Sequence, residues 1–229
     1  MKKSSKNRLM PFHAERFPDN SLFHRIARTV CRAGVLPRKE LYEAWETARR
    51  VRRRFRGGRV VDLACGHGLL AHIMMLLDNT SPLALAVDPS IPDSAARLSQ
   101  VLEEEWPGLG TRIRYLAEDL GNVPLLSTDI VVSAHACGGL TDTILERAVS
   151  ARARVAVLPC CHDLKTCADG GLSNWMAPDL AVDTVRALTL ASQGYDIRTA
   201  KIPETITPKN RLLMGAPREM PAGNVAGPS

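Results

Sequence analysis

The sequence predicts an α/β fold in which helices cover both faces of a mainly parallel sheet, with an N-terminal helical extension before it. The first observation is a series of apolar, strand-like runs, at residues 59–64, 83–88, 113–119, 129–135 and 154–160. The second is that helical stretches separate these runs, at 68–78, 93–105 and 140–150. Apolar runs that alternate with helices are typical of a parallel sheet buried on both faces.

Further segments flank this alternation and complete the expected organisation. Residues 1–20 are polar and contain two prolines, which predicts an arm or a loosely packed lid. Helices are expected at 21–31, 37–55 and 179–192, and closing strands at 195–202 and 210–216. We therefore expect an arm and helical extension over 1–56, a main domain over 57–217 and a disordered tail over 218–229.

The composition is that of a globular chain without a membrane span. Of the 229 residues, 45% are hydrophobic. No apolar run approaches the ~20 residues that cross a bilayer. The basic N-terminus has no apolar segment behind it, so a secretory signal is not predicted and a cytoplasmic location is expected. The six cysteines are accordingly expected to be reduced.

Positive charge is concentrated in one short segment. The net charge is +6, and residues 49–59, RRVRRRFRGGR, contain seven arginines. One interpretation is a solvated helix end, where cations complement the helix dipole. The other is a phosphate-binding patch that gathers an RNA substrate, with Arg49, Arg52, Arg53 and Arg56 as the expected contacts.

The first strand-like run leads into a glycine-rich turn, in the stretch VVDLACGHGLLAHIM at 60–74. Small residues between a buried strand and a helix let the backbone turn tightly and approach a ligand. The stretch resembles the first motif of class I S-adenosylmethionine-dependent methyltransferases, Asp-hydrophobic-Gly-x-Gly-x-Gly, with Ala64 in place of the first glycine. A dinucleotide-binding turn normally lacks the acidic residue, so a nicotinamide cofactor fits less well. The resemblance implies contacts to S-adenosylmethionine from Asp62, Ala64, Cys65, Gly66 and Gly68.

Polar residues at the ends of later runs fit the same cofactor. Asp88 lies about 20 residues past the turn, where a carboxylate can accept both ribose hydroxyls, although a helix cap or turn residue is the alternative. In methyltransferases an acidic residue after the next strand commonly faces the adenine amino group, which implies Asp119 or Glu118 here. Ser133, at the end of the fourth run, is expected to join the cofactor site. A cationic sulfonium that carries no phosphate favours such carboxylates.

Two segments that contain cysteine and histidine are expected at the same edge of the sheet. They are VVSAHACGGLTD at 131–142 and VLPCCHD at 157–163. Together they resemble methyltransferase-like families with His-x-Cys-Gly after the fourth strand and Cys-Cys-x-His or Cys-Cys-His after the fifth. These families include tRNA 2′-O-methyltransferases. Asp163 replaces a second histidine of the tRNA enzymes, and their zinc-finger modules are missing.

The two segments are expected to meet and to line a methyl-acceptor pocket. His135 and His162 are the expected bases, since histidine titrates near neutral pH. Cys160 and Cys161 are expected to shape the pocket, with a covalent cysteine nucleophile and packing as small hydrophobic side chains as alternatives. A zinc site is a third alternative. Adjacent cysteines on a strand would point to opposite faces, however, so no obligatory metal is expected.

The sequence therefore predicts a class I methyltransferase that uses S-adenosylmethionine and acts on RNA. Two alternatives are a methyltransferase of a small molecule or protein side chain, and a non-catalytic cofactor-binding protein.

Overall fold

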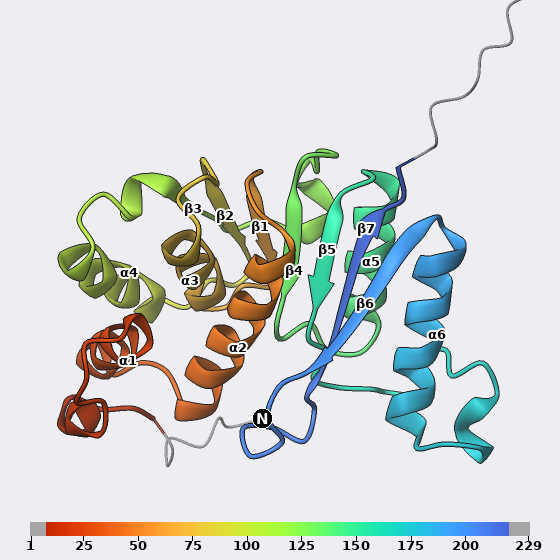
Figure 1. Cartoon of the computed structure of the whole chain (residues 1–229), viewed down its shortest axis with the longest axis horizontal. Helices are drawn as coiled ribbons and strands as arrows, with labels where there is room; N and C mark the ends of the chain where they lie inside the picture. Colours follow the sequence, from red (N-terminus) through yellow and green to blue (C-terminus); the bar gives the residue numbers. More distant parts are fainter. Residues whose placement is uncertain (1–7, 220–229) are drawn as a thin grey trace, which may run out of the picture.

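The chain folds around a seven-stranded sheet with helices on both sides. A computed structural model describes residues 8–219 (Figure 1). The strands are β1 (Val60–Leu63), β2 (Ala84–Val87), β3 (Ile113–Leu116), β4 (Ile130–Ser133), β5 (Arg154–Val157), β6 (Tyr195–Lys201) and β7 (Arg211–Pro217). The α-helices are α1 (Leu22–Ala33), α2 (Arg38–Arg54), α3 (Leu69–Leu77), α4 (Ser94–Glu105), α5 (Gly139–Ser150) and α6 (Pro178–Ser192). Every expected strand and helix forms, but β3, β4 and β5 end before the predicted runs do, and the remaining residues form loops.

The order of the strands places a ligand-binding edge. The order is β3-β2-β1-β4-β5-β7-β6, with β1 to β5 paired in parallel. β7 is antiparallel to both β5 and β6. The direction of the strand order reverses between β1 and β4, where Asp62 pairs with Val132. In open α/β sheets, ligands bind outside the carboxyl ends of the strands at such a reversal.

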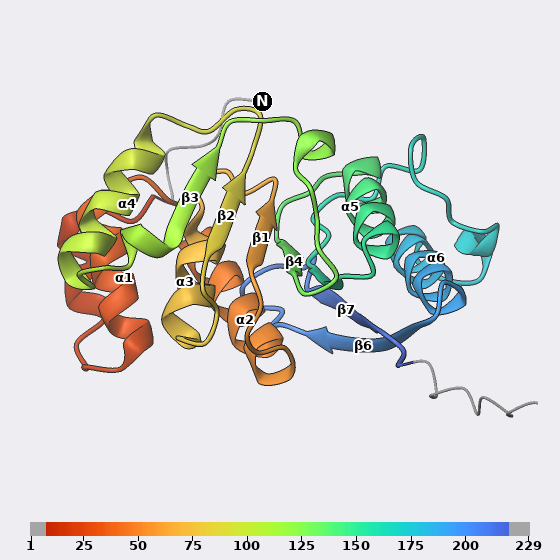
Figure 2. The same cartoon turned by 90° about the horizontal axis from the view of Figure 1, so that it is seen from above.

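Alternate residues of the strands face two different helical layers. Val60 and Ile130 belong to a hydrophobic cluster with residues of α1, α2, α3 and α4. Val61 and Val131 belong to a second cluster with residues of α5 and α6. Figure 2 shows these two layers on opposite sides of the sheet. Because successive side chains of a strand point to opposite faces, the two layers bury both faces. The expected α/β architecture is confirmed.

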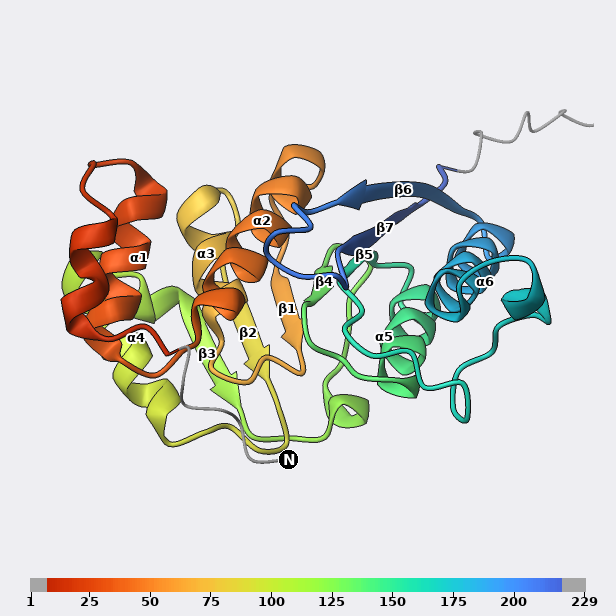
Figure 3. The ribbon, with the colours of Figure 1, turned by 90° about the horizontal axis from the view of Figure 1, so that it is seen from below.

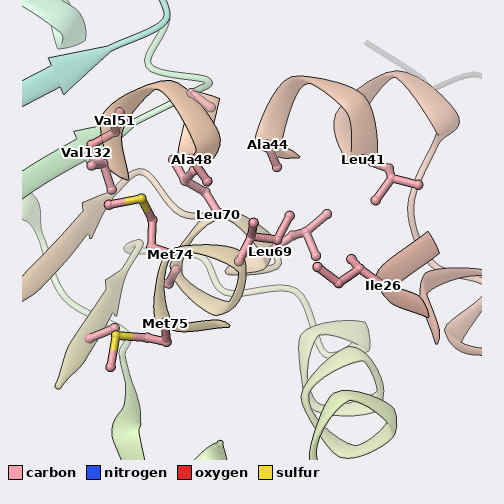
Figure 4. Close-up of a cluster of buried hydrophobic side chains, with 14 of the residues drawn as sticks. Ile26, Leu41, Ala44, Ala48, Val51, Leu69, Leu70, Met74, Met75 and Val132 are labelled. Atoms are coloured by element: carbon pink, nitrogen blue, oxygen red, sulfur yellow. The ribbon is translucent and has the colours of Figure 1, made fainter. Parts of the chain in front are cut away.

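Helix α2 joins the N-terminal part of the chain to the sheet. Its apolar side includes Leu41, Ala48 and Val51, and Figure 4 shows Ala48 and Val51 beside Leu70 and Met74 of α3. All five side chains are at most 4% exposed. The N-terminal helices thus share one core with the sheet, and the division at residue 56 stays a prediction.

The segment before α1 is more ordered than expected for an arm. A short 3-10 helix forms at Pro11–Arg16, and Leu9 and Phe17 on either side of it are at most 3% exposed. The amide of Leu9 donates to the carbonyl of Leu36, 2.8 Å away. The apolar side chains of Leu9 and Phe17 therefore anchor the two ends of this segment, whereas the residues between them are exposed or half-buried. The expected disordered tail lies almost entirely outside the described residues.

The connection between β6 and β7 reaches α2, although the two are far apart in sequence (Figures 1 and 3). Buried Thr207 of this connection lies against Glu43 of α2. α2 therefore links the first helices to the last strands. Within residues 8–219, none of the helices has the length and apolar character that a membrane span requires.

Candidate active site

The glycine-rich turn follows β1 and is held by side chains from neighbouring strands. Ala64, Gly66 and Gly68 adopt φ values of 59°, 53° and 73°. A Cβ atom on Gly68 would lie 2.6 Å from the Tyr115 hydroxyl, so this position admits only glycine. Ala64 bears a Cβ in the left-handed region at a cost of about 1 kcal/mol, which explains why glycine is usual at this position in the motif. The backbone is thereby shaped to approach a ligand closely.

The carboxyl group of Asp62 is buried beneath this turn, and little around it would balance a negative charge. Its side chain is 1% exposed, and it accepts a hydrogen bond of 3.1 Å from the amide of Ala71. Burial raises the pKa of Asp62 to about 8, and the charge of Asp88 adds to this rise. Close by on β4, the hydroxyl of Ser133 is buried without a hydrogen-bond partner. Both groups would be satisfied by a cationic, hydrogen-bonding ligand.

The other expected cofactor contacts hold the surrounding loops. Asp88 accepts hydrogen bonds from the amides of Gly66 and Ser90, at 3.0 and 2.9 Å. It therefore fixes the glycine turn and its own turn together, and each oxygen keeps a lone pair for a ribose hydroxyl. Asp119 is exposed and caps the 3-10 helix Leu120–Asn122, and Glu118 is exposed beside it. Adenine contacts from either residue stay a prediction.

Helix α2 contributes to the same site. A small cavity beside the turn is lined by Leu36, Glu40 and Ala44 from the α2 region, together with Asp62, Cys65 and His135. The Nε2 atom of His135 lies 3.9 Å from the Oε2 atom of Glu43, and the His135 side chain is 40% exposed. Burial raises the pKa of Glu43, and the charge of Lys39 opposes that rise. His135, predicted as a base, is thus accessible and next to a buried carboxyl group.

Three cysteines converge after β4 and β5. The Sγ atoms of Cys137, Cys160 and Cys161 all lie within 4.8 Å of one another. The two adjacent cysteines were expected to point to opposite faces of a strand, but β5 ends at Val157, and their Sγ atoms are 3.8 Å apart. This expectation is wrong because the alternation of a strand does not extend into the loop. Burial raises the pKa values of Cys137 and Cys160, and a high thiol pKa disfavours the covalent nucleophile.

His162 turns away from these cysteines. Its side chain is 3% exposed, and Nε2 lies 2.7 Å from a carboxylate oxygen of Asp183 on α6. Burial would raise the pKa of Asp183, but the hydrogen bonds from His162 and Arg211 outweigh this and lower it. The two segments were expected to bring their cysteines and histidines together. The three cysteines do meet, but the side chain of His162 contacts Asp183. This placement favours a structural role for His162 over the predicted role as a base.

Comparison with known proteins identifies the family. A family model described as a methyltransferase domain matches residues 39–166, more than half of the chain. The chain belongs to this methyltransferase family. No curated protein matches the sequence.

Solved structures share the fold at low sequence identity. The apo S-adenosylmethionine-dependent methyltransferase SibL is 19% identical, with a TM-score of 0.53 over 93% of this chain and 67% of that one. The precorrin-6y C5,15-methyltransferase of Geobacter metallireducens GS-15 is 11% identical, with a TM-score of 0.51 over 76% and 87% of the two chains. The ribosomal protein L11 methylase of Lactobacillus delbrueckii subsp. bulgaricus is 16% identical, with a TM-score of 0.50 over 77% of each chain. These similarities concern the fold alone.

The expectation of a class I S-adenosylmethionine-dependent methyltransferase is confirmed. The cofactor carries its methyl group on a positively charged sulfonium. Asp62 and Ser133 of this methyltransferase fit such a group. Burial raises the pKa of Asp62, and a nearby positive charge would lower it again. The buried hydroxyl of Ser133 has no hydrogen-bond partner. The narrower resemblance to tRNA 2′-O-methyltransferases is not confirmed.

The arginine segment of the methyltransferase lies away from this site. α2 ends at Arg54, just before β1 begins, so the segment lies at the opposite edge of the sheet from the carboxyl ends of the strands. Arg52 is 2% exposed and pairs with Asp78 at 3.1 Å. Arg49 pairs with Glu46 at 3.3 Å. The predicted substrate contact from Arg52 conflicts with this burial, whereas Arg53 and Arg56 are exposed.

A second basic surface, which the sequence did not suggest, lies near the active edge. It is a groove of about 570 Å³, defined here as the basic groove, and its lining includes Arg8, His13, Arg16, Arg38, Lys39 and Tyr42. None of the nine lining residues is acidic. The guanidinium of Arg38 lies over the Tyr42 ring at 5.3 Å. The groove was missed because its residues come from the segment before α1, from α2 and from the β6–β7 connection.

Proposed function

We propose that this S-adenosylmethionine-dependent methyltransferase acts on RNA, with the RNA backbone held in the basic groove. The observation that carries the proposal is the continuity between the groove and the acceptor side of the cofactor site. Lys39 lines the groove and pairs with Glu43 at 3.4 Å, and Glu43 lies 3.9 Å from His135. A chain of two contacts therefore joins the basic groove to the predicted base.

The residue types in the groove support a nucleic acid over an uncharged small molecule. Clustered cations neutralise phosphates, and an aromatic side chain offers a face on which a base can stack. Tyr42 is half-buried, with its ring packed against Phe23 and Arg38, so its position is fixed before the substrate arrives. A fixed aromatic group costs little entropy on binding.

In the proposed mechanism, His135 accepts the proton of the attacking hydroxyl or amine of the substrate. The exposed imidazole of His135 is accessible to a substrate, and the buried Glu43 carboxyl group lies 3.9 Å from its Nε2 atom. Asp62 and Asp88 would hold S-adenosylmethionine in place, and the glycine turn would bring the backbone close to this cofactor. The substrate phosphates, held in the groove, fix the distance to the methyl group.

The test compares two double variants that change the net charge by the same amount at different places. Arg16→Glu with Arg38→Glu reverses charge in the basic groove, and Arg53→Glu with Arg54→Glu does so at the opposite edge of the sheet. Purified protein, labelled S-adenosylmethionine and total cell RNA would be used to measure methyl transfer, RNA affinity and the dependence of affinity on salt. We expect the groove pair to lose most RNA methylation and to flatten the salt dependence by about one unit of slope per lost phosphate contact. Cofactor affinity should stay unchanged.

Two outcomes would contradict the proposal. Label that appears only in protein or small-molecule fractions of a cell extract would exclude RNA as the substrate. Loss of RNA binding in the Arg53 and Arg54 variant alone would assign the substrate contacts to the arginine segment that the sequence analysis singled out.

A further inference from the structure

Three thiols meet at the active edge without a role in the proposed methyl transfer. Cys137 follows β4, whereas Cys160 and Cys161 follow β5, and all three Sγ atoms lie within 4.8 Å of one another. The backbone fixes this arrangement, because Cys137 and Cys161 form a parallel bridge and the amide of Gly138 donates to the carbonyl of Cys161 at 3.2 Å. The convergence is therefore a property of the two loops and not of side-chain rotation alone.

We propose that Cys137, Cys160 and Cys161 form a three-thiolate binding site for Zn²⁺. Thiolates are soft ligands that select zinc over magnesium or calcium. A disulfide would use two of the three sulfur atoms and leave the third unexplained, whereas one metal ion uses all three. Binding converts the thiols to thiolates and releases their protons to solvent, so the positive ion replaces the protons.

The distances between the sulfur atoms fit the ion after one small movement. A tetrahedral site with Zn–S bonds of about 2.3 Å places its sulfur atoms about 3.8 Å apart. The Cys160–Cys161 distance is 3.8 Å, and the Cys137–Cys160 distance is 2.9 Å. Cys137 must therefore move outward by about 1 Å, and its side chain is exposed and has room to do so.

Three ligands leave a fourth position of the tetrahedron open. Cys137 and Cys161 are both exposed, so this position faces solvent at the carboxyl edge of the sheet. The thiols of Cys137 and Cys160 approach the carbonyl of His135, which belongs to the residue predicted as the base. Sites with three protein ligands and one open position are typical of zinc that binds an exchangeable ligand. The ion would thus connect the loops after β4 and β5 and keep a position for a further donor.

The test measures metal on the full chain, purified in the presence of a thiol reductant and titrated with Zn²⁺. We expect about one ion per chain, seen by elemental analysis, and protection of three thiols from alkylation, seen by mass spectrometry. Cys160→Ser and Cys137→Ser should each lower the Zn²⁺ affinity at least about tenfold. Cys31→Ala removes a buried cysteine outside the site and is the matched control, with unchanged binding.

Substitution with Co²⁺ keeps the test independent of variant folding. The wild-type chain should develop the sulfur-to-cobalt charge-transfer absorption of a thiolate site, and added imidazole should shift the ligand-field bands if the fourth position is open. Zinc binding that is equal in wild type, Cys137→Ser and Cys160→Ser would overturn the proposal. Absence of bound Zn²⁺, together with formation of a Cys137–Cys160 disulfide under mild oxidation, would replace the metal site by a redox pair.

Discussion

Replacing Arg52 by alanine separates the two interpretations of the arginine segment. The Arg52 guanidinium pairs with Asp78 at 3.1 Å and donates to the Met74 carbonyl and the Ser81 hydroxyl at 3.0 and 2.8 Å. Both side chains of the ion pair are 2% exposed. Burial lowers the pKa of Arg52 to about 10, against the opposing effect of Asp78, so the residue stays charged at neutral pH. Arg52→Ala thus leaves a buried carboxylate without its main counter-ion.

The expected loss of stability follows from what Asp78 keeps. Breaking a buried ion pair from one side costs about 3–5 kcal/mol. Asp78 retains hydrogen bonds from the amides of Gly57 and Thr80 and from the Thr80 hydroxyl. We therefore expect the lower end, about 3 kcal/mol, which corresponds to a fall in Tm of about 6–12 °C for a chain of this size.

The assay is urea or thermal unfolding followed by circular dichroism, with Arg53→Ala as the control. Arg53 is exposed in the same helical turn, so its replacement should change the free energy of unfolding by no more than about 0.5 kcal/mol. Equal stability of the two variants would refute the reasoning and return Arg52 to the candidate substrate contacts.

Further predictions concern the candidate site. His135→Ala should lower kcat about a hundredfold without loss of folding. His162→Ala should mainly lower Tm, because Asp183 loses one of its partners and keeps Arg186 and Arg211. Steady-state kinetics and thermal melts distinguish the two variants. Because the pKa of Asp62 is raised to about 8 in the folded chain, the stability that its protonated form contributes is present at acid pH and is lost as pH rises through about 8. The wild type should therefore lose stability relative to Asp62→Asn between about pH 5 and 8, by up to about 1.4 kcal/mol per pH unit. Urea titrations at several pH values measure this difference. A wild-type and variant difference that does not change with pH would contradict this. Gly68→Ala should weaken cofactor binding and lower stability by about 2 kcal/mol, measured by calorimetry, because its Cβ would meet the Tyr115 hydroxyl.

The sheet was predictable from the sequence because its signals are local. The apolar runs of β1, β2 and β4 are each followed closely by an α-helix, and this alternation is enough to indicate the class of fold. The glycine turn and Asp62 were predictable for the same reason, since the chain order places them at the end of the first strand. The three-cysteine convergence was only half predicted, because the end of β5 at Val157 leaves no mark in the sequence.

Features that depend on distant partners could not be predicted. An arginine in a basic segment is expected to be exposed to solvent. Arg52 is buried because it pairs with Asp78, which belongs to the loop after α3. His162 was expected to face the cysteines, but Asp183 of α6 fixes its ring elsewhere. The basic groove brings together residues 8–16, 38–42 and 205–206, whose cations are unremarkable in each segment taken alone.

The position of β7 has a consequence for how the chain is assembled during synthesis. This strand comes last along the described residues, yet it lies inside the sheet, between β5 and β6. β6 therefore leaves the ribosome before the strand with which it pairs, and β5 has an unpaired edge until β7 arrives. Unpaired edges are prone to association with other chains, so premature termination before Arg211 should yield an aggregating product. The β6–β7 connection, which forms one wall of the basic groove, is likewise fixed only by this final insertion. A partly synthesised chain would thus contain the cofactor turn well before it could hold a substrate.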